Sequence, residues 1–359
     1  MLYPRKYIKD LKPVYHGGPD YAELQKLGFS ASEIIDFSVN CNPFGCTPEA
    51  ARAASEARFD IYPDSQCLAL REAVAKFLKL DTANIICGAG SMEIIHLTAL
   101  AYLNEGDKVC ILQPSFGEYA LASRIFGAQI IFFQANMQTL NFDLKTLALM
   151  IEKEKPKLLF LANPNNPTGQ YHSKKDMLDL LKSCSDTLLV LDEAYIAFTK
   201  EAWDSTFLSQ YPNVLVLRSM TKDYALSGLR LGYAFACPDI IKTLQKVQSP
   251  WSVSAPAQAA GLVCIKDQKF LCQSTQKVAD GKEYLVRQLR ALGYNIYESA
   301  SNFFLMEVGD ASIFRQKLLQ KGIAVRDCAS FGLPSMVRLS PRIPHENECL
   351  IDILQRFKK

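Results

Sequence analysis

The sequence predicts an α/β protein: a large domain with a mostly parallel sheet flanked by helices, followed by a smaller α+β domain. Between about residues 85 and 236, short apolar runs such as KVCIL, KLLFLA and NVLVL alternate with longer amphipathic stretches, which is typical of βαβ units. The runs are continuously apolar, as strands covered on both faces require. After about residue 250 the pattern changes to a long helical stretch and shorter strands, which indicates a separate α+β unit.

Three parts are expected along the chain. Residues 1–45 lack a strong period before IIDFSVN and are predicted to form an arm that packs on the small domain beside the active site. Residues 46–250 are predicted to form the large domain and 251–359 the small domain. Within the small domain we expect a long helical stretch over about 255–293 and a helix near 311–321.

Composition and charge narrow the class of protein. Apolar residues make up 49% of the 359 and charged residues 21%, as in an ordinary globular protein, and no window approaches the eighteen or more apolar residues of a membrane span. The net charge of +3 is small and the basic residues are scattered along the sequence. The sequence therefore gives no indication of a basic surface that binds nucleic acid or an anionic membrane. Small molecules are the expected partners.

Cysteine usage and the N-terminus indicate a reducing compartment. The eleven cysteines form no C-x-x-C pair and occur singly in apolar strings such as VCIL, so we expect buried free thiols rather than disulfides or a metal site. The first residues, MLYPRKYIKDLKP, have no apolar segment of the kind that a secretory signal contains. A cytoplasmic location is predicted.

One lysine stands where α/β enzymes place reactive groups. Lys222 lies in SMTKDYALSGLRLGY, directly after the predicted strand NVLVLR. A partly buried lysine can lose its proton and attack the aldehyde of pyridoxal 5'-phosphate, while Ser219 and Arg230 could neutralise the cofactor's phosphate. The alternative is an ordinary solvated lysine in a loop.

Two other strand ends carry polar groups suited to the same cofactor. In LLVLDEAYIAF, Asp192 could keep a pyridine nitrogen protonated and Tyr195 could bind the ring oxygen; alternatively, the acid caps the next helix. In ANPNNPTG, Asn166 could present its amide to a ring substituent, although the segment could also be a plain turn.

A glycine-rich segment and an aromatic residue complete the candidate cofactor site. In CGAGSMEIIH, Gly88, Gly90, Ser91 and Met92 stand between a predicted strand and a helix, where backbone N–H groups can hold a phosphate. Phe116 in QPSFGEY could stack on a pyridine face. Each signal alone also fits a common turn or a core aromatic residue.

The order and spacing of these segments resemble the fold type I pyridoxal-phosphate enzymes of the class I/II aminotransferase superfamily over nearly the whole chain. The resemblance implies that Lys222 carries the cofactor as a Schiff base and that Asp192 pairs with the pyridine nitrogen. It also implies that Asn166 and Tyr195 bind the ring oxygen, and that Phe116 stacks on the ring. The phosphate would be held by Gly90, Ser91, Met92, Ser219 and Arg230.

The resemblance further implies a homodimer with the active site at the subunit interface. In this superfamily a tyrosine from one subunit reaches the phosphate of its neighbour, and Tyr62 of FDIYPDS occupies the matching position.

Within the superfamily the chain is most similar to the threonine-phosphate decarboxylases of cobalamin biosynthesis, with the histidinol-phosphate aminotransferases as close relatives. Three stretches favour the decarboxylases: HGG at His16 to Gly18 with the later IIDFSVNCNPFG, SPWSVSAPA around Trp251, and VRDCASFG around Arg326. The aminotransferases usually have Tyr-Asn where this chain has Trp251 and Ser252.

The substrate is expected to be a small phosphorylated amino acid. By resemblance Arg338 grips a carboxylate and Arg326 the anionic side chain, both bidentately. Further candidate substrate contacts are His16, Ser38, Asn40, Asn42 and Asn166. Surface ion pairs and turns are the alternative roles for these residues.

The expected reaction is decarboxylation of O-phosphothreonine or O-phosphoserine, which would supply the linker of the cobamide nucleotide loop. The alternative is an aminotransferase acting on histidinol phosphate or an aromatic amino acid. A third possibility is a binding or regulatory protein that retains the fold without catalysis.

Overall fold

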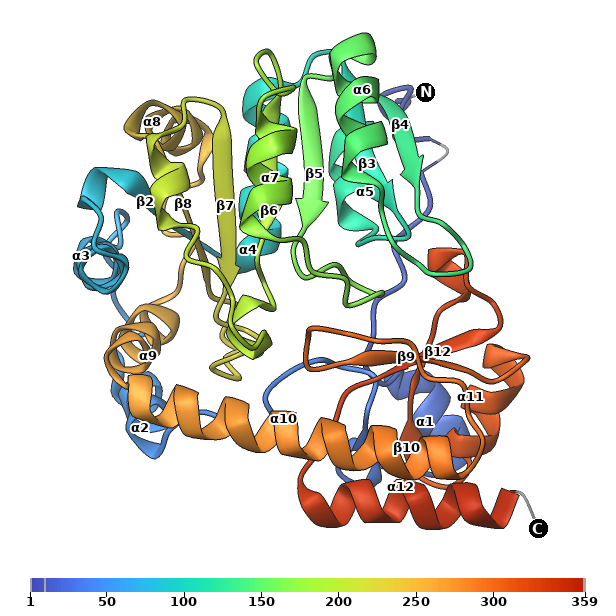
Figure 1. Cartoon of the computed structure of the whole chain (residues 1–359). Helices are drawn as coiled ribbons and strands as arrows, with labels where there is room; N and C mark the ends of the chain where they lie inside the picture. Colours follow the sequence, from blue (N-terminus) through green and yellow to red (C-terminus); the bar gives the residue numbers. More distant parts are fainter. Residues whose placement is uncertain (1, 10, 358–359) are drawn as a thin grey trace.

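The computed structural model describes residues 2–9 and 11–357, so residues 1 and 359, the outer ends of the predicted domains, lie outside the described part. Figure 1 shows a large sheet with helices on both faces, and a smaller group of strands and helices beneath it that includes the C-terminal segment.

The large sheet has seven strands in the order β2-β8-β7-β6-β5-β3-β4. Only β8 runs antiparallel to its neighbours, so the sheet is mostly parallel, as the sequence predicted. The strands are β2 (Ile85–Gly88), β3 (Lys108–Gln113), β4 (Gln129–Gln134), β5 (Leu158–Ala162), β6 (Leu188–Asp192), β7 (Val214–Ser219) and β8 (Gly232–Ala236).

Both faces of this sheet are covered by helices, which explains why its central strands are apolar throughout. In β5, Leu159 and Leu161 pack into the hydrophobic cluster on one face, and Leu158 and Phe160 into the cluster on the other. Because successive side chains of a strand point to opposite faces, a strand between two helical layers needs an apolar residue at every position.

Twelve α-helices occur in the described residues. One face of the large sheet packs on α3, α6, α7 and α9, and the other on α4, α5 and α8. The helices are α1 (Tyr21–Leu27), α2 (Pro48–Glu56), α3 (Leu68–Leu78), α4 (Gly90–Tyr102), α5 (Glu118–Arg124), α6 (Leu144–Glu154), α7 (Lys174–Leu181), α8 (Pro238–Val247), α9 (Ala255–Lys266), α10 (Gln268–Ala291), α11 (Ala311–Leu319) and α12 (Pro344–Phe357).

The smaller part is built on an antiparallel sheet in the order β11-β12-β9, packed against α10, α11 and α12. A separate parallel pair joins β1 near the N-terminus to β10. These strands are β1 (Ile35–Asp36), β9 (Phe304–Glu307), β10 (Ile323–Ala324), β11 (Arg326–Asp327) and β12 (Met336–Leu339). The predicted α/β class with a smaller α+β part is therefore confirmed.

The helical stretch expected over 255–293 is present, but it is interrupted once. The chain forms two helices, because Asp267 leaves the helical conformation (φ −97°, ψ 70°) and its side chain accepts a hydrogen bond from the N–H of Phe270 at the start of α10. The apolar period continues across this break, so periodicity alone did not reveal it. The first of the two helices, α9, packs against α2 and α3 in the main core. The boundary near residue 250 stays a prediction, and the packing of α9 favours a later one.

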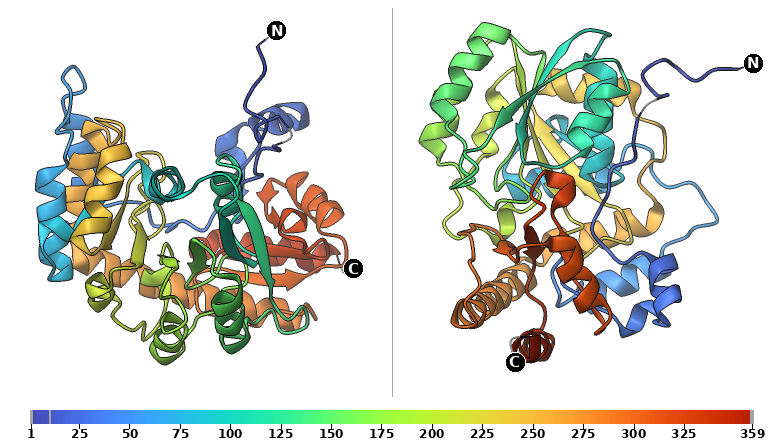
Figure 2. Two further views of the ribbon diagram at one scale, coloured as in Figure 1. Left: turned by 90° about the horizontal axis from the view of Figure 1, so that it is seen from above. Right: turned by 90° about the vertical axis from the view of Figure 1, so that its right-hand side faces the viewer.

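The N-terminal arm contacts both parts of the molecule (Figure 2). A Cβ at Gly127 would lie 2.5 Å from the ring of Tyr7, so the arm runs in close contact with the end of α5. Farther along, Glu23 of α1 accepts two hydrogen bonds from Arg315 of α11, at 2.9 and 2.5 Å. The arm thus links the large sheet to the small one.

Within the described residues, no helix combines the length and the hydropathy needed to cross a bilayer. All eleven cysteines are free; Cys272 and Cys349 are exposed, whereas most of the others are buried.

Candidate active site

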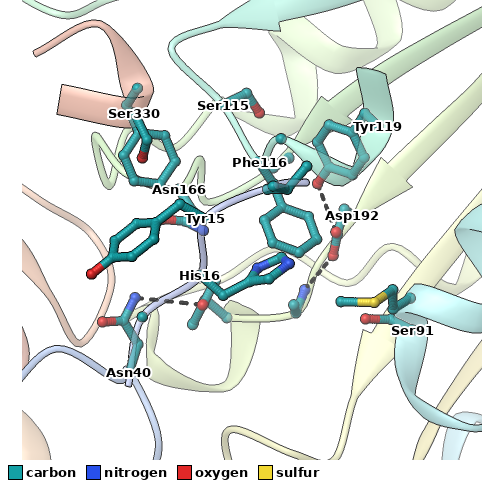
Figure 3. Close-up of a pocket in the computed structure, with 18 of the residues that line it drawn as sticks. Tyr15, His16, Asn40, Ser91, Ser115, Phe116, Tyr119, Asn166, Asp192 and Ser330 are labelled. Carbon is teal, nitrogen blue, oxygen red and sulfur yellow. Dashed lines mark hydrogen bonds between the residues drawn. The ribbon is translucent and has the colours of Figure 1, made fainter. Parts of the chain in front are cut away.

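A cavity of about 790 Å³ opens at the carboxyl ends of the parallel strands, bordered by the arm and the small sheet (Figure 3). Residues that follow β3, β5, β6 and β7 meet there because parallel strands end at one edge of their sheet. The structure brings most of the predicted site residues to its walls: His16, Ser38, Asn40, Ser91, Met92, Phe116, Asn166, Asp192, Tyr195, Ser219, Lys222, Arg230, Arg326 and Arg338.

Asp192, the last residue of β6, is a buried carboxylate with a phenol partner. The Tyr119 hydroxyl donates to Oδ2 at 2.7 Å, and the N–H of Ala194 donates to Oδ1 at 3.0 Å. Burial raises the pKa of Asp192, while these hydrogen bonds and the charge of Lys222 oppose the rise. A cationic group facing Asp192 would stabilise its charged form.

Lys222 lies in the loop after β7, held by the arm. The N–H of Asn42 donates to the Lys222 carbonyl at 2.8 Å, and Nζ lies 3.9 Å from the Cys41 thiol. The Asn42 side chain, a candidate for the phosphate pocket, instead donates to the carbonyl of Asp223 and to Ser274. It therefore fixes the lysine loop and does not line the cavity.

An anion cradle forms where α4 begins. Gly90 has a φ of +78°, and a Cβ there would lie 2.8 Å from Nη2 of Arg230. A Cβ at Gly232 would lie 2.5 Å from the N–H nitrogen of Ser91, so β8 packs tightly on the first turn of the helix. The arginine and the helix N-terminus consequently face one small space, which is a favourable environment for a phosphate.

Ser219 and Thr221 border the same space, with their hydroxyl oxygens 2.7 Å apart.

Aromatic and amide groups surround the space in front of Asp192. The Phe116 ring packs edge-on against Tyr119, with centroids 5.6 Å apart. Asn40 donates through Nδ2 to the Tyr195 hydroxyl at 3.4 Å, and its buried Oδ1 has no hydrogen-bond partner among the described residues. These groups form a flat slot with an unsatisfied polar atom on one wall.

Two arginines occupy neighbouring positions on adjacent strands of the small sheet. Arg326 of β11 pairs in register with Arg338 of β12, and the two are only 3% and 5% exposed. Arg338 donates to Asn166 and to the Ser38 carbonyl, and Arg326 to the Tyr15 carbonyl. Burial and the charge of Arg338 lower the pKa of Arg326. No carboxylate of the described residues forms a salt bridge with either arginine, so the pair favours an anionic ligand.

His16 reaches the cavity from the arm. Its Nε2 lies 2.8 Å from Glu118 Oε1, and its ring is tilted against Phe116 with centroids 5.8 Å apart.

Tyr62 lies away from this cavity. Its side chain is exposed and stacks on Trp251, with ring centroids 4.3 Å apart, at a loop that projects from the surface. The Gln258 side chain fixes the loop by donating to the Asp64 carbonyl at 2.9 Å. Within one chain, Tyr62 therefore contributes nothing to the cavity.

The motifs missed several residues of the cavity wall. Glu118 and Tyr119 lie two and three residues after the predicted stacker Phe116, and both are buried. Tyr15 and Ser330 line the cavity and contact Arg326. The centroid of the Tyr15 ring lies 4.3 Å from the guanidinium carbon of Arg326, and the Ser330 hydroxyl lies 2.8 Å from Nη2 of Arg326. No sequence signal marked these two.

The donor set fits pyridoxal 5'-phosphate. Asp192 could face a protonated pyridine nitrogen, the slot beside Phe116 could take the ring, and the unpartnered Oδ1 of Asn40 shows that the polar groups there are not satisfied by protein alone. The cradle at Gly90 and Arg230 suits the phosphate. Fold and site together define the class of fold type I pyridoxal-phosphate enzymes.

Comparison with known proteins supports that class. Residues 32–354 match the family described as aminotransferase class I and II. The chain is 35% identical to a histidinol-phosphate aminotransferase of Moorella thermoacetica, with 98% of this chain and 92% of that protein covered. The solved histidinol-phosphate aminotransferase of Sinorhizobium meliloti in complex with pyridoxal-5'-phosphate shares the fold, with a TM-score of 0.89, 24% identity and coverage of 98% and 97%. L-threonine-O-3-phosphate decarboxylase of Porphyromonas gingivalis aligns with a TM-score of 0.80, 26% identity and coverage of 90% and 99%.

The chain belongs to the class I and II aminotransferases, and its cofactor is pyridoxal 5'-phosphate. The predicted superfamily and cofactor are confirmed. The curated relatives named histidinol-phosphate aminotransferase favour the alternative function over the decarboxylase that the sequence motifs suggested, since the decarboxylase is a structural neighbour at lower identity.

Asp223, beside Lys222, gives the site a testable pH dependence. Burial raises the pKa of Asp223 to about 7, so the folded protein retains a proton there that the unfolded chain loses near pH 4. The free energy of unfolding should therefore fall as pH rises from about 4 to 7, and this loss should persist above pH 7. Asp223→Asn should raise the melting temperature of the cofactor-loaded protein by about 2–4 °C at pH 8, and by less at pH 5.

Thermal unfolding at both pH values measures this effect, with Asp352→Asn on the exposed face of α12 as the control. An equal shift at the two pH values would contradict the prediction.

Proposed function

We propose that this chain is an aminotransferase whose amino substrate carries a phosphate, of the histidinol-phosphate type. The observation that carries the proposal is the buried pair Arg326 and Arg338, which faces the same cavity as Lys222 and Asp192 without a carboxylate partner among the described residues. An amino donor such as glutamate and a phosphorylated amino substrate both present anions to that wall.

The cofactor roles that we assign follow from the contacts. Lys222 would bind the cofactor covalently, Asp192 would face the ring nitrogen, and Tyr119 would hold the Asp192 carboxylate in place. Asn166 and Tyr195 would bind the ring oxygen, while Phe116 would stack on the ring. The phosphate would lie against Gly90, Ser91, Met92, Ser219 and Arg230.

The substrate roles follow from charge. Arg338 would hold a carboxylate, because its guanidinium is already oriented by the Ser38 carbonyl and by Asn166. Arg326 would hold the phosphate, with His16, Ser38 and Asn40 lining the same wall.

Bound pyridoxal phosphate supplies an electron sink that weakens the bond at the substrate's α-carbon standing perpendicular to the ring. The residues that orient the substrate therefore choose the reaction. In an aminotransferase, Lys222 would take the proton from the α-carbon of the amino donor, and it would give a proton to the α-carbon of the oxo acceptor as that acceptor becomes the amino product. Arg338 would keep the carboxylate near the ring plane, so that the C–H bond stands upright.

Decarboxylation of an O-phospho amino acid is the second candidate. It is favoured by the position of His16, whose HGG segment resembles the decarboxylases and which lines the cavity beside Ser38 and Asn40. If the phosphate is held by both His16 and Arg326, the carboxylate could be turned out of the ring plane and leave as carbon dioxide.

Assembly as a homodimer is part of the proposal. Tyr62 stands on a projecting loop with exposed Phe59 and Ile61, and enzymes of this fold typically pair so that such a loop reaches the neighbouring site. Tyr62 would then contact the cofactor phosphate of the other subunit.

One experiment separates the two candidate reactions. Cofactor-loaded protein is incubated with histidinol phosphate plus 2-oxoglutarate, and separately with O-phosphothreonine and O-phosphoserine. We expect glutamate from the first mixture and no carbon dioxide from the others, with both signals absent in Lys222→Ala. Carbon dioxide without glutamate would replace our proposal by the second candidate, and a loaded protein that gives neither product would contradict both.

Substitution of the two arginines should affect the KM values of different substrates. Arg326→Gln removes a charge-assisted hydrogen bond to phosphate, so the KM for histidinol phosphate should rise about 10- to 100-fold, with little change in the KM for 2-oxoglutarate. Arg338→Gln should raise the KM for 2-oxoglutarate, whose carboxylate Arg338 would hold. Steady-state kinetics with each substrate varied in turn measures both effects. Equal effects of either variant on both substrates would contradict the assignment.

A shared site predicts complementation between two inactive subunits. Tyr62→Ala and Lys222→Ala homodimers should each lose most activity, since one lacks the phosphate contact and the other the reactive amine. Refolding the two together should restore activity, because one site of each hybrid dimer contains Lys222 from one subunit and Tyr62 from the other. Absence of recovery despite hybrid formation, checked by native mass spectrometry, would place Tyr62 outside the active site.

A further inference from the structure

We propose that Glu118 is a positioning residue that fixes His16 at the cavity, so that His16 donates a hydrogen bond to the phosphate of the substrate. The inference rests on the proposed function in one respect: it takes an anionic group of the substrate to be a phosphate. Glu118 belongs to no recognised cofactor or substrate motif of the chain.

Both carboxylate oxygens of Glu118 are engaged by histidines from distant segments. Oε1 lies 2.8 Å from Nε2 of His16 in the arm, and Oε2 lies 3.1 Å from Nε2 of His96 in α4. Glu118 is 4% exposed, so few other partners can reach it. The two histidines hold the pKa of Glu118 at about 2, and the carboxylate is ionised at neutral pH.

An ionised carboxylate can only accept hydrogen bonds, so each histidine must donate to Glu118 through an Nε2–H group. This fixes the position of the proton on His16. Among the described residues, none hydrogen bonds to Nδ1 of His16, and its side chain is 43% exposed at the cavity. The Nδ1 side of the ring is therefore left for a phosphate in the cavity, to which it donates when both ring nitrogens carry a proton.

The HGG segment is shaped to place His16 there. A Cβ at Gly17 would lie 2.8 Å from the Ser38 carbonyl oxygen and 3.6 Å from Nη2 of Arg338, so the chain passes in close contact with the substrate arginine. Gly18 has a φ of +109°, a conformation that favours glycine, and its N–H donates to the Ser38 hydroxyl at 2.9 Å.

Arg326 belongs to the same arrangement, because its Nη2 donates to the Tyr15 carbonyl at 2.8 Å. The backbone on one side of His16 thus contacts Arg326, and the backbone on the other side packs near Arg338. His16 and the two arginines line the same cavity, and Glu118 sets the orientation of the histidine within it.

A double-mutant cycle tests whether Glu118 acts through His16. Binding of inorganic phosphate to cofactor-loaded protein is measured by titration calorimetry, since the bound cofactor occupies its own phosphate site. His16→Ala should weaken phosphate binding about tenfold and Glu118→Gln about fivefold, because each removes or misaligns one charge-assisted hydrogen bond. In the His16→Ala background, Glu118→Gln should have almost no further effect.

The matched control is Lys6→Gln, which breaks another contact of the arm, the exposed ion pair with Glu105 at 2.5 Å. Its affinity for phosphate should stay within about twofold of that of the unmodified protein. This control separates the positioning of His16 from the general docking of the arm. If Glu118→Gln does not load the cofactor, Glu118→Asp takes its place, because it keeps the charge and shortens the reach. The same non-additivity is expected.

Additive effects of His16→Ala and Glu118→Gln would overturn the inference, as would unchanged phosphate binding in His16→Ala or no phosphate binding by the unmodified protein. A lower melting temperature without weaker phosphate binding would leave Glu118 a purely structural role and would also overturn it. The turnover assay with histidinol phosphate fails or succeeds independently of these titrations, so loss of the proposed function is distinguishable from loss of this inference.

Discussion

Buried charge without a salt bridge among the described residues is the constraint on which the site depends. On one wall of the cavity Asp192 is 6% exposed and has a phenol and a backbone N–H as hydrogen-bond partners. On another wall Arg326 and Arg338 are buried directly opposite each other, with carbonyl, hydroxyl and amide groups as partners. Isolated buried charges are costly, so ligands of opposite charge would stabilise this arrangement. A cationic ring nitrogen on one side and anionic substrate groups on the other meet that requirement.

The arm explains how these walls are held at fixed separation. It packs on the large sheet through Tyr7, joins α11 through Glu23, and pairs with β10 through Ile35. Between these anchors it supplies groups that face the cavity, above all His16 and Asn40. A chain segment without a strong hydrophobic period therefore determines the geometry between a cofactor wall and a substrate wall, because it contacts both.

The two candidate reactions need nearly the same residues, which is why relatives with this fold are named both for transamination and for decarboxylation. The difference lies in which bond at the α-carbon stands upright over the ring. In the proposed site, that orientation would depend on how Arg326, Arg338 and His16 contact one substrate, and small displacements of these residues would change it. Overall sequence similarity accordingly favours transamination, whereas the local HGG resemblance favours decarboxylation.

The sequence by itself determined the class of fold and the cofactor. Continuous apolar runs such as LLFLA required a sheet covered on both faces, and Lys222, Asp192 and Asn166 follow successive strands whose ends must meet. It did not reveal the break at Asp267, since the hydrophobic period continues through it. Nor did it reveal the partners Tyr119 and Glu118, or that Asn42 supports the lysine loop rather than the cavity. Only the tertiary structure decided those contacts, because each joins segments far apart in the chain, and no periodicity or local spacing records which side chains of distant segments come within hydrogen-bonding distance.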